Sequence, residues 1–311
     1  MSEFLGRLPD RKADTSEMGQ SMPDQIFYHI HTIWLFTVGD LSTTCLQSVL
    51  FGLSGAASGR FTTPAITDDT RASRSTPQAA VGLIRSLPPV FLFVWLLLLV
   101  GQLSNQSAVG APEEDALSKP YRPIPAGQIS QRQVREGLMP PAIFLALLVS
   151  LALSVHWEAA TFIALLLNGA ALALLGEGAL KLAACSGGST VSAAGYAWSC
   201  IVGLVIAMTV QVQDFRDQEG DAARGRKTLP LVLGDAPTRG GTIVSMLLWA
   251  VLVPWLCGAG VMGCSSSVVT AGAAAVGLAV WRTPGADARS YKLWSVWLAN
   301  VYIMPWLALL C

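Results

Sequence analysis

Apolar residues dominate long blocks of this chain, and two polar islands at 105–137 and 214–240 separate groups of these blocks. About 20 apolar residues cross the hydrocarbon core of a bilayer as a helix. Most of the blocks reach roughly that length, so they predict eight membrane-spanning helices. The first block is the longest and is interrupted by Asp40. The eight blocks are 26–58, 81–104, 138–156, 159–176, 195–213, 241–261, 262–282 and 291–311.

A ninth span is predicted at 177–194, which is Gly/Ser-rich and only weakly apolar. Three clear spans lie between the two polar islands, so placing both islands on one membrane face requires a fourth. Small residues allow helices to approach closely in lipid, so this segment can be a helix inside a bundle. We therefore expect an all-α, polytopic membrane bundle of about nine transmembrane helices. It forms a single domain at 26–311, after a polar, disordered cytosolic tail at 1–25.

Composition supports this reading. Of the 311 residues, 52% are hydrophobic and 13% are charged, against roughly 25% charged residues in a typical soluble domain. The 20 basic and 20 acidic residues cancel, so the chain is not expected to bind nucleic acid. A soluble enzyme with an unusually large core is the alternative, and the block pattern disfavours it. The six cysteines form no CxxC pair, and we expect inert thiols.

The second island carries the most specific chemical pattern. Asp214, Asp217 and Asp221 recur at spacings of three and four residues directly after an apolar block. On a helix these positions share one face, where the carboxylates repel one another unless a cation joins them. Oxygen ligands suit Mg²⁺, which bridges carboxylates to substrate phosphates. Arg224 and Lys227 follow and suit phosphate oxygens; a solvated charged loop is the alternative.

The first island also begins at the end of an apolar block. It offers the amide of Asn105, the carboxylates of Glu114 and Asp115, and the cations Lys119 and Arg122. Glu113 is an alternative to Glu114. Two acidic clusters with adjacent cations on one face of a bundle indicate a diphosphate held between magnesium ions.

Two further charged positions lie inside apolar surroundings. Asp40 is either functional, as intramembrane carboxylates commonly are, or a hydrogen-bond partner within the bundle. Lys181 lies four residues after Glu177, a spacing at which the two side chains can pair; diphosphate binding is the other possibility for Lys181.

These motifs resemble those of the UbiA superfamily of intramembrane prenyltransferases over roughly residues 26–311. The second motif is close to the family pattern, from Asp214 through Asp221 to the Lys227-Thr-Leu-Pro segment. The end of the first also matches, from Asp115 through Lys119-Pro-Tyr-Arg-Pro-Ile-Pro. Its beginning departs from the family's NDxxDxxxD pattern, because Gln106 and Ala111 stand where acids are expected.

This departure is similar to a fungal branch that includes membrane-bound terpene cyclases. The resemblance implies a Mg²⁺-dependent class I terpene cyclase of secondary metabolism that acts on farnesyl or geranylgeranyl diphosphate. It implies endoplasmic-reticulum membranes, with the acidic loops in the cytosol as the positive-inside rule also indicates, and no protein partner. The alternative is a prenyltransferase with an aromatic or other small acceptor. An ion-coupled transporter is disfavoured, because such sites lie near the midplane.

The expected roles follow from charge. Metal binding is assigned to Asn105, Glu114, Asp115, Asp214, Asp217 and Asp221, of which the four aspartates are also expected to be catalytic. Diphosphate binding is assigned to Lys119, Arg122, Lys181, Arg224 and Lys227. Positive groups facing the leaving diphosphate stabilise the charge that grows there, and an apolar cavity protects the resulting carbocation from water.

Overall fold

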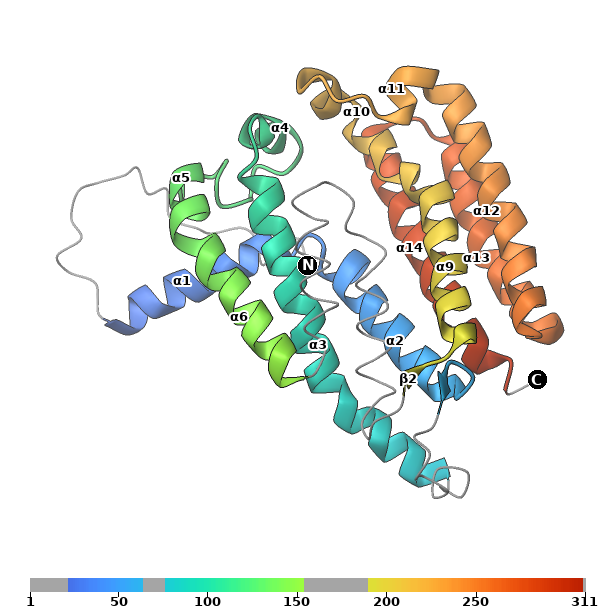
Figure 1. Ribbon diagram of the computed structural model, residues 1–311. Helices are drawn as coiled ribbons and strands as arrows, with labels where there is room; N and C mark the ends of the chain where they lie inside the picture. The colour runs from blue at the N-terminus through green and yellow to red at the C-terminus, as the bar shows by residue number, and fades with distance from the viewer. Residues whose placement is uncertain (1–21, 64–75, 154–189, 310–311) are drawn as a thin grey trace.

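Long apolar helices packed against one another form most of the computed structural model, which describes residues 22–63, 76–153 and 190–309 (Figure 1). The long helices are α1 (Met22–Thr37), α2 (Leu46–Ser58), α3 (Thr76–Gln106), α6 (Met139–Ala152), α9 (Ala193–Thr209), α12 (Asp235–Cys257), α13 (Gly260–Val280) and α14 (Pro284–Leu307). The short helices are η1 (Leu41–Cys45), α4 (Ala111–Ser118), α5 (Gln131–Gln133), η2 (Val134–Leu138), η3 (Val210–Val212), α10 (Asp214–Ala223) and α11 (Leu229–Leu233). The strands β1 (Thr62–Thr63) and β2 (Thr190–Val191) pair antiparallel.

The predicted all-α membrane architecture is confirmed. Five described segments are long and apolar enough to cross a membrane, and each overlaps a predicted span. The predicted span 159–176 and most of 177–194 lie outside the described residues, so the count of nine stays a prediction. The five segments are Val81–Gln106, Gln131–Ala152, Ala193–Val212, Asp235–Cys257 and Gly260–Val280.

The first apolar block differs from the single span predicted at 26–58. The chain turns at Val38–Asp40 and separates α1 from the π-helical η1 and α2. Asp40 is held at this turn by an ion pair with Arg122. Helix α1 also begins at Met22, within the tail predicted at 1–25; residues 1–21 lie outside the described residues.

The last helix begins earlier than predicted. Helix α14 starts at Pro284 rather than near residue 291. The Thr283 side chain accepts a hydrogen bond from the Ala286 amide and caps the helix, and proline is favoured in a first helical turn. Residues 284–290 include charged side chains and therefore lie outside the predicted span. In the structure, Asp287 is buried against Arg239.

Two large hydrophobic clusters hold the helices together, and a smaller third one joins α1, α3 and η2 around Phe36. One joins α2, α3 and α6, around Phe93 and Leu97. The other joins α9, α12, α13 and α14, around Trp249, Trp294 and Trp297. Helix α14 also packs against α2 and so links the two groups. Large apolar side chains elsewhere on α6 and α12 point outward, as expected for surfaces that contact lipid.

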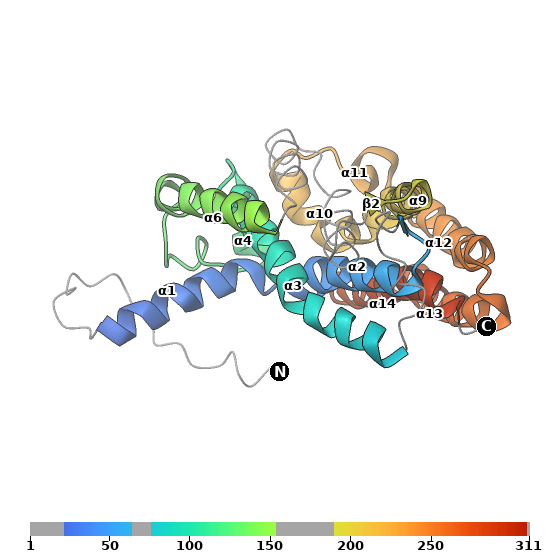
Figure 2. The same ribbon diagram turned by 60° about the horizontal axis from the view of Figure 1, so that its bottom comes forward.

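Both polar islands lie at the same end of the bundle. Figures 1 and 2 show α4, which belongs to the first island, near α10 from the second, and the two helices are in contact. The prediction that the islands share one face is therefore confirmed. Arg60 lies at the other end of the bundle, where its guanidinium donates a hydrogen bond to the carbonyl of Cys257.

Helix α9 offers a test of the packing at this opposite end. A Cβ at Gly195 would lie 2.7 Å from the carbonyl oxygen of Phe61, whereas a Cβ at Gly203 would meet no atom within 4 Å. Gly195→Ala is expected to lower the free energy of unfolding by about 1–3 kcal/mol, because backbone must shift. Gly203→Ala is the matched control and should not destabilise. Thermal unfolding in detergent measures both, and equal midpoints would contradict this packing.

Candidate active site

Three carboxylates line the short helix α10, as the sequence predicted. Helix α9 ends in the 3-10 turn η3, after which α10 carries Asp214, Asp217 and Asp221 at helical spacing. Burial, reinforced by the neighbouring charges of Asp221 and Asp217, raises the pKa of Asp214 to about 6. Burial likewise raises the pKa of Asp221. Burial is thus the main cause of both shifts, and the neighbouring carboxylates add to it.

Helix α4 brings Glu114 from the first island against α10. Arg224 Nη1 donates to Glu114 Oε2 at 2.7 Å, and Arg226 Nη1 lies 3.4 Å from Glu114 Oε1. Arg226 also pairs with Asp221 at 3.0 Å. A Cβ at Gly220 would stand 3.0 Å from Glu114 Cγ, so glycine at this position permits the close approach.

Asp115 and Arg122 form a buried pair next to this contact. Arg122 Nη1 donates to both oxygens of Asp115, at 2.8 and 3.0 Å. Arg122 Nη2 donates to Asp40 at 3.2 Å. Asp40 is thus a partner of a site residue, one of the two roles that the sequence left open.

Lys119 and Arg216 both contact Asp217. Lys119 Nζ lies 3.5 Å from Asp217 Oδ2, and Arg216 Nε lies 3.2 Å from the same oxygen. The Arg216 guanidinium also stacks over the Tyr291 ring, 4.7 Å from its centroid. Arg216 therefore contacts both a carboxylate of α10 and an aromatic ring of α14.

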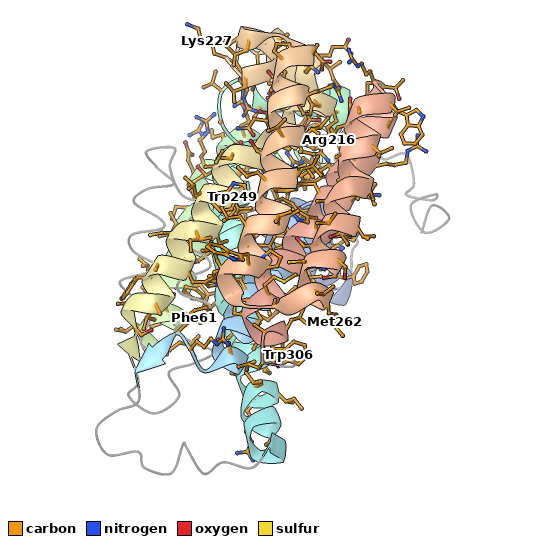
Figure 3. All side chains as sticks on the ribbon, turned by 90° about the vertical axis from the view of Figure 1, so that its right-hand side faces the viewer. Phe61, Arg216, Lys227, Trp249, Met262 and Trp306 are labelled. Atoms are coloured by element: carbon orange, nitrogen blue, oxygen red, sulfur yellow. The ribbon has the colours of Figure 1, made fainter. Side chains whose placement is uncertain are left out.

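The remaining predicted site residues lie less centrally. The side chains of Asn105, Glu113 and Lys227 are exposed, and Figure 3 places Lys227 at the end of the bundle opposite Phe61, Met262 and Trp306. Lys181 lies outside the described residues. Within the part of the chain that the structure describes, no group of three or more His, Cys, Asp or Glu side chains is gathered closely enough to hold a metal ion.

A cavity lies in the bundle beside η3 and α10. Its volume is about 90 Å³, well above the roughly 10–15 Å³ that one water needs. Gln213, the residue before Asp214, lines it together with Tyr291, on which Arg216 stacks. One part of the wall is aromatic and aliphatic and is formed chiefly by Phe51, Val202, Ile206, Trp294, Leu298 and Tyr302. Another part is polar and is formed by Thr43, Thr44, Gln47, Ser48 and Ser199.

A second group of ion pairs lies between α12 and α14 and contacts α10. It was not predicted from the sequence. Arg239 on α12 donates to both oxygens of Asp287 on α14, at 2.6 and 2.8 Å. Its Nε donates to Asp235 at 2.9 Å. The Arg239 guanidinium lies 4.4 Å from the centroid of the Phe215 ring on α10, and Gln218 donates to Asp235.

Sequence signals for the missed residues were partial. Arg239 follows Asp235 by four residues, the spacing of a helical ion pair. Nothing in the sequence indicates its contact with Asp287, which is 48 residues away. Arg216 lies between two motif aspartates and Arg226 directly precedes Lys227, so both were visible as neighbours of the motif.

The chemistry of the α10 carboxylates suits Mg²⁺, although in the described arrangement these side chains are not gathered closely enough to hold the ion. Carboxylate oxygens are its preferred protein ligands. The neighbouring negative charges that help raise the pKa of Asp214 would be relieved by a bound cation. Asp214, Asp217 and Asp221 are the residues that would hold the ion.

The raised pKa of Asp214 predicts a pH dependence in the absence of divalent cations. Its folded-state pKa of about 6 lies above the ordinary value of 3.8. The folded state then binds more protons than the unfolded state between these values, so stability falls as pH rises from about 4 to 6. Allowing for partial solvent screening, Asp214→Asn should remove about 1–2 kcal/mol of this fall. Thermal unfolding of both proteins at pH 4.5 and 7.5 measures it; parallel pH profiles would contradict the assignment.

The Arg239 group predicts strong coupling between two substitutions. In Asp287→Asn, the buried guanidinium of Arg239 loses one of its two charged partners. This substitution is therefore expected to lower the free energy of unfolding by about 3–5 kcal/mol. Arg239→Met combined with Asp287→Leu should cost much less, because no buried charge at either position is left unpaired. Thermal unfolding of the single and double variants measures the coupling, and additive losses would argue against a mutual pair.

Comparison with known proteins identifies the fold and family. The sequence profile of the UbiA prenyltransferase family matches residues 169–298. A solved structure titled "Structural and mechanistic insights into the biosynthesis of Digeranylgeranylglyceryl phosphate synthase in membranes" aligns with a TM-score of 0.50, over 89% of this chain and 97% of that one, at 16% identity. It therefore shares the fold.

Three curated relatives have similar sequences. Diterpene cyclase eriG of Hericium erinaceus is 29% identical over 51% of this chain and 59% of its own length. Somaliensene A/B synthase of Streptomyces somaliensis is 31% identical over 69% of each chain. Polyprenyl transferase eriF of Hericium erinaceus is 29% identical over 48% of this chain and 57% of its own. The chain thus spans between 57% and 69% of the length of these relatives. With its five membrane-length segments and the paired acidic islands, this chain belongs to the UbiA prenyltransferase family of integral membrane proteins.

Proposed function

We propose that this protein is a Mg²⁺-dependent class I terpene cyclase that ionises an allylic isoprenoid diphosphate, farnesyl or geranylgeranyl. The observation that carries the proposal is the cavity with aromatic walls directly beside the carboxylates of α10. A diphosphate bound among the charged groups would leave its prenyl chain in apolar surroundings. The names of similar proteins, among them a diterpene cyclase and a somaliensene synthase, support this reading.

The charged residues would bind and orient the diphosphate. Lys119 and Arg224 are held near α10 by ion pairs with Asp217 and Glu114. A phosphate oxygen can replace a carboxylate as the acceptor of such a cation, because both are anionic oxygens. Lys227 is exposed at the same end of the bundle. Its positive charge would stabilise the negative charge that develops on the leaving diphosphate. Mg²⁺ bound by Asp214, Asp217 and Asp221 would supply further neutralisation of the diphosphate.

The cavity residues would protect and guide the carbocation. Val202, Ile206 and Leu298 offer no hydrogen-bonding side chain, so the part of the wall that they form would disfavour water that could quench the cation. The faces of aromatic rings attract a cation by about 2 kcal/mol when it is desolvated. Phe51, Trp294 and Tyr302 occupy the wall in this role. The product would be a cyclic hydrocarbon released by loss of a proton.

A prenyltransferase is the second candidate. The 29% identity to a polyprenyl transferase favours it. It shares the same ionisation step, but an aromatic or other small acceptor would capture the cation. Residence in the endoplasmic reticulum is part of the proposal for either enzyme and comes from the resemblance to the fungal branch. The basic residues at the α4 and α10 end support placing that end in the cytosol.

Product analysis without an acceptor separates the two candidates. Microsomes containing the protein are incubated with Mg²⁺ and, separately, geranyl, farnesyl and geranylgeranyl diphosphate, then extracted into hexane for gas chromatography–mass spectrometry. A cyclase is expected to give a new hydrocarbon that disappears in Asp217→Ala, because that variant lacks a carboxylate of α10. Consumption of diphosphate only when an aromatic acceptor is added would instead establish the prenyltransferase. Hydrocarbon formation unchanged in a correctly inserted Asp217→Ala would remove Asp217 from the site.

A further inference from the structure

The cations that pair with the acids differ in exposure on the two sides of the site, although Asp221 on α10 is itself as buried as Asp115. Asp115 and Arg122 are both nearly inaccessible, with side-chain exposures of 4% and 5%. On α10 the partners are more open: the Lys119 side chain is 20% exposed and that of Arg226 is 40% exposed. Separating a buried pair leaves an uncompensated charge, whereas a solvated pair is broken at little cost. A metal ion would therefore displace the partners of α10 before it displaced Arg122.

Arg122 is also fully engaged by groups other than Asp115. Its Nη2 donates to Asp40 at 3.2 Å, on the turn that follows α1. The same nitrogen lies 3.5 Å from Gln102 Oε1 on α3. A guanidinium fixed at two further points cannot easily turn away from Asp115. Arg122 therefore connects three parts of the chain: the turn after α1 through Asp40, α3 through Gln102 and α4 through Asp115.

Gln106 gives an independent indication from the same motif. It occupies a position where the family pattern has an acid, yet it is only 1% exposed. Its Nε2 donates to the carbonyl of Phe36 on α1 at 3.0 Å and to Gln102 Oε1 at 3.1 Å. Gln102 thus connects Gln106 with Arg122. This part of the first motif forms a hydrogen-bonded network within the bundle.

We infer that Asp115 is the counter-ion of Arg122 and not a metal ligand, and that metal binding in this chain rests on the carboxylates of α10. Asp115 is then a positioning residue: by fixing Arg122 it sets α4 in place, and α4 presents Glu114 to Arg224. The inference rests on the proposed function for the metal and diphosphate that the site would take. It differs from the expectation, drawn from the sequence, that Asp115 and the α10 aspartates share the metal.

The inference is tested by making the same change, Asp to Glu, on each side of the site. The assay measures metal binding and does not require catalysis. Full-length protein is purified in detergent, and its thermal midpoint is followed as Mg²⁺ is added at a fixed concentration of inorganic diphosphate, since a ligand of the folded state raises the midpoint. Asp214→Glu is expected to raise the Mg²⁺ concentration for half of the shift by about 10-fold or more. Asp115→Glu keeps the charge beside Arg122 and should stay within about twofold.

Two outcomes of this titration would overturn the inference. One is an Asp115→Glu protein that needs as much additional Mg²⁺ as Asp214→Glu, since Asp115 would then contribute to the metal site. The other is a wild-type protein without any Mg²⁺-dependent shift, since the α10 carboxylates would then hold no metal. Because inorganic diphosphate replaces the substrate, a failed cyclase assay leaves this test decisive.

A charge-removal cycle tests the pairing itself. Asp115→Asn should lower the thermal midpoint in the absence of Mg²⁺, because Arg122 loses its buried partner. Adding Arg122→Gln should restore much of the loss and keep the Mg²⁺ dependence near that of the wild type. A double variant that is folded but has lost a Mg²⁺ response that Arg122→Gln alone retains would show that Asp115 acts on the metal and would overturn the inference.

Discussion

The burial of carboxylates on one face of α10 is the constraint on which the candidate site depends. Removing Asp214 and Asp221 from water raises their pKa values, and neighbouring negative charges add to the effect. The structure places Arg226 against Asp221, and Lys119 and Arg216 against Asp217. A cation bound here, as proposed above, would relieve the repulsion between the neighbouring carboxylates.

Contacts with α12 and α14 hold α10, and with it the three carboxylates, in place. Arg239 and Asp287 form a buried, doubly hydrogen-bonded pair between α12 and α14, and Phe215 of α10 packs on the guanidinium. Buried ion pairs contribute little net stability compared with apolar residues of similar size. Their directional hydrogen bonds fix a geometry, however, and here that geometry orients the face of α10 that carries the carboxylates.

The arrangement separates two chemical environments over a short distance. Charged groups gather at one end of the helices, and the apolar cavity begins beside the same helix, at Gln213 and Tyr291. Arg216 belongs to both regions through its ion pair with Asp217 and its stacking on Tyr291. A substrate with an anionic head and an apolar chain matches this division, because each part is accommodated by the surroundings that suit it.

The sequence by itself determined the all-α membrane architecture, the helical face of α10 and the meeting of the two polar islands. These follow from local spacing and from the cost of polar groups in lipid, which act along the chain. Tertiary structure decided which charges pair. The contacts of Arg122 with Asp40, Arg239 with Asp287 and Gln106 with Phe36 join residues 48 to 82 positions apart. The packing of helices, which no local pattern records, brings these partners together and so decides which acids are neutralised and which stay available for a metal.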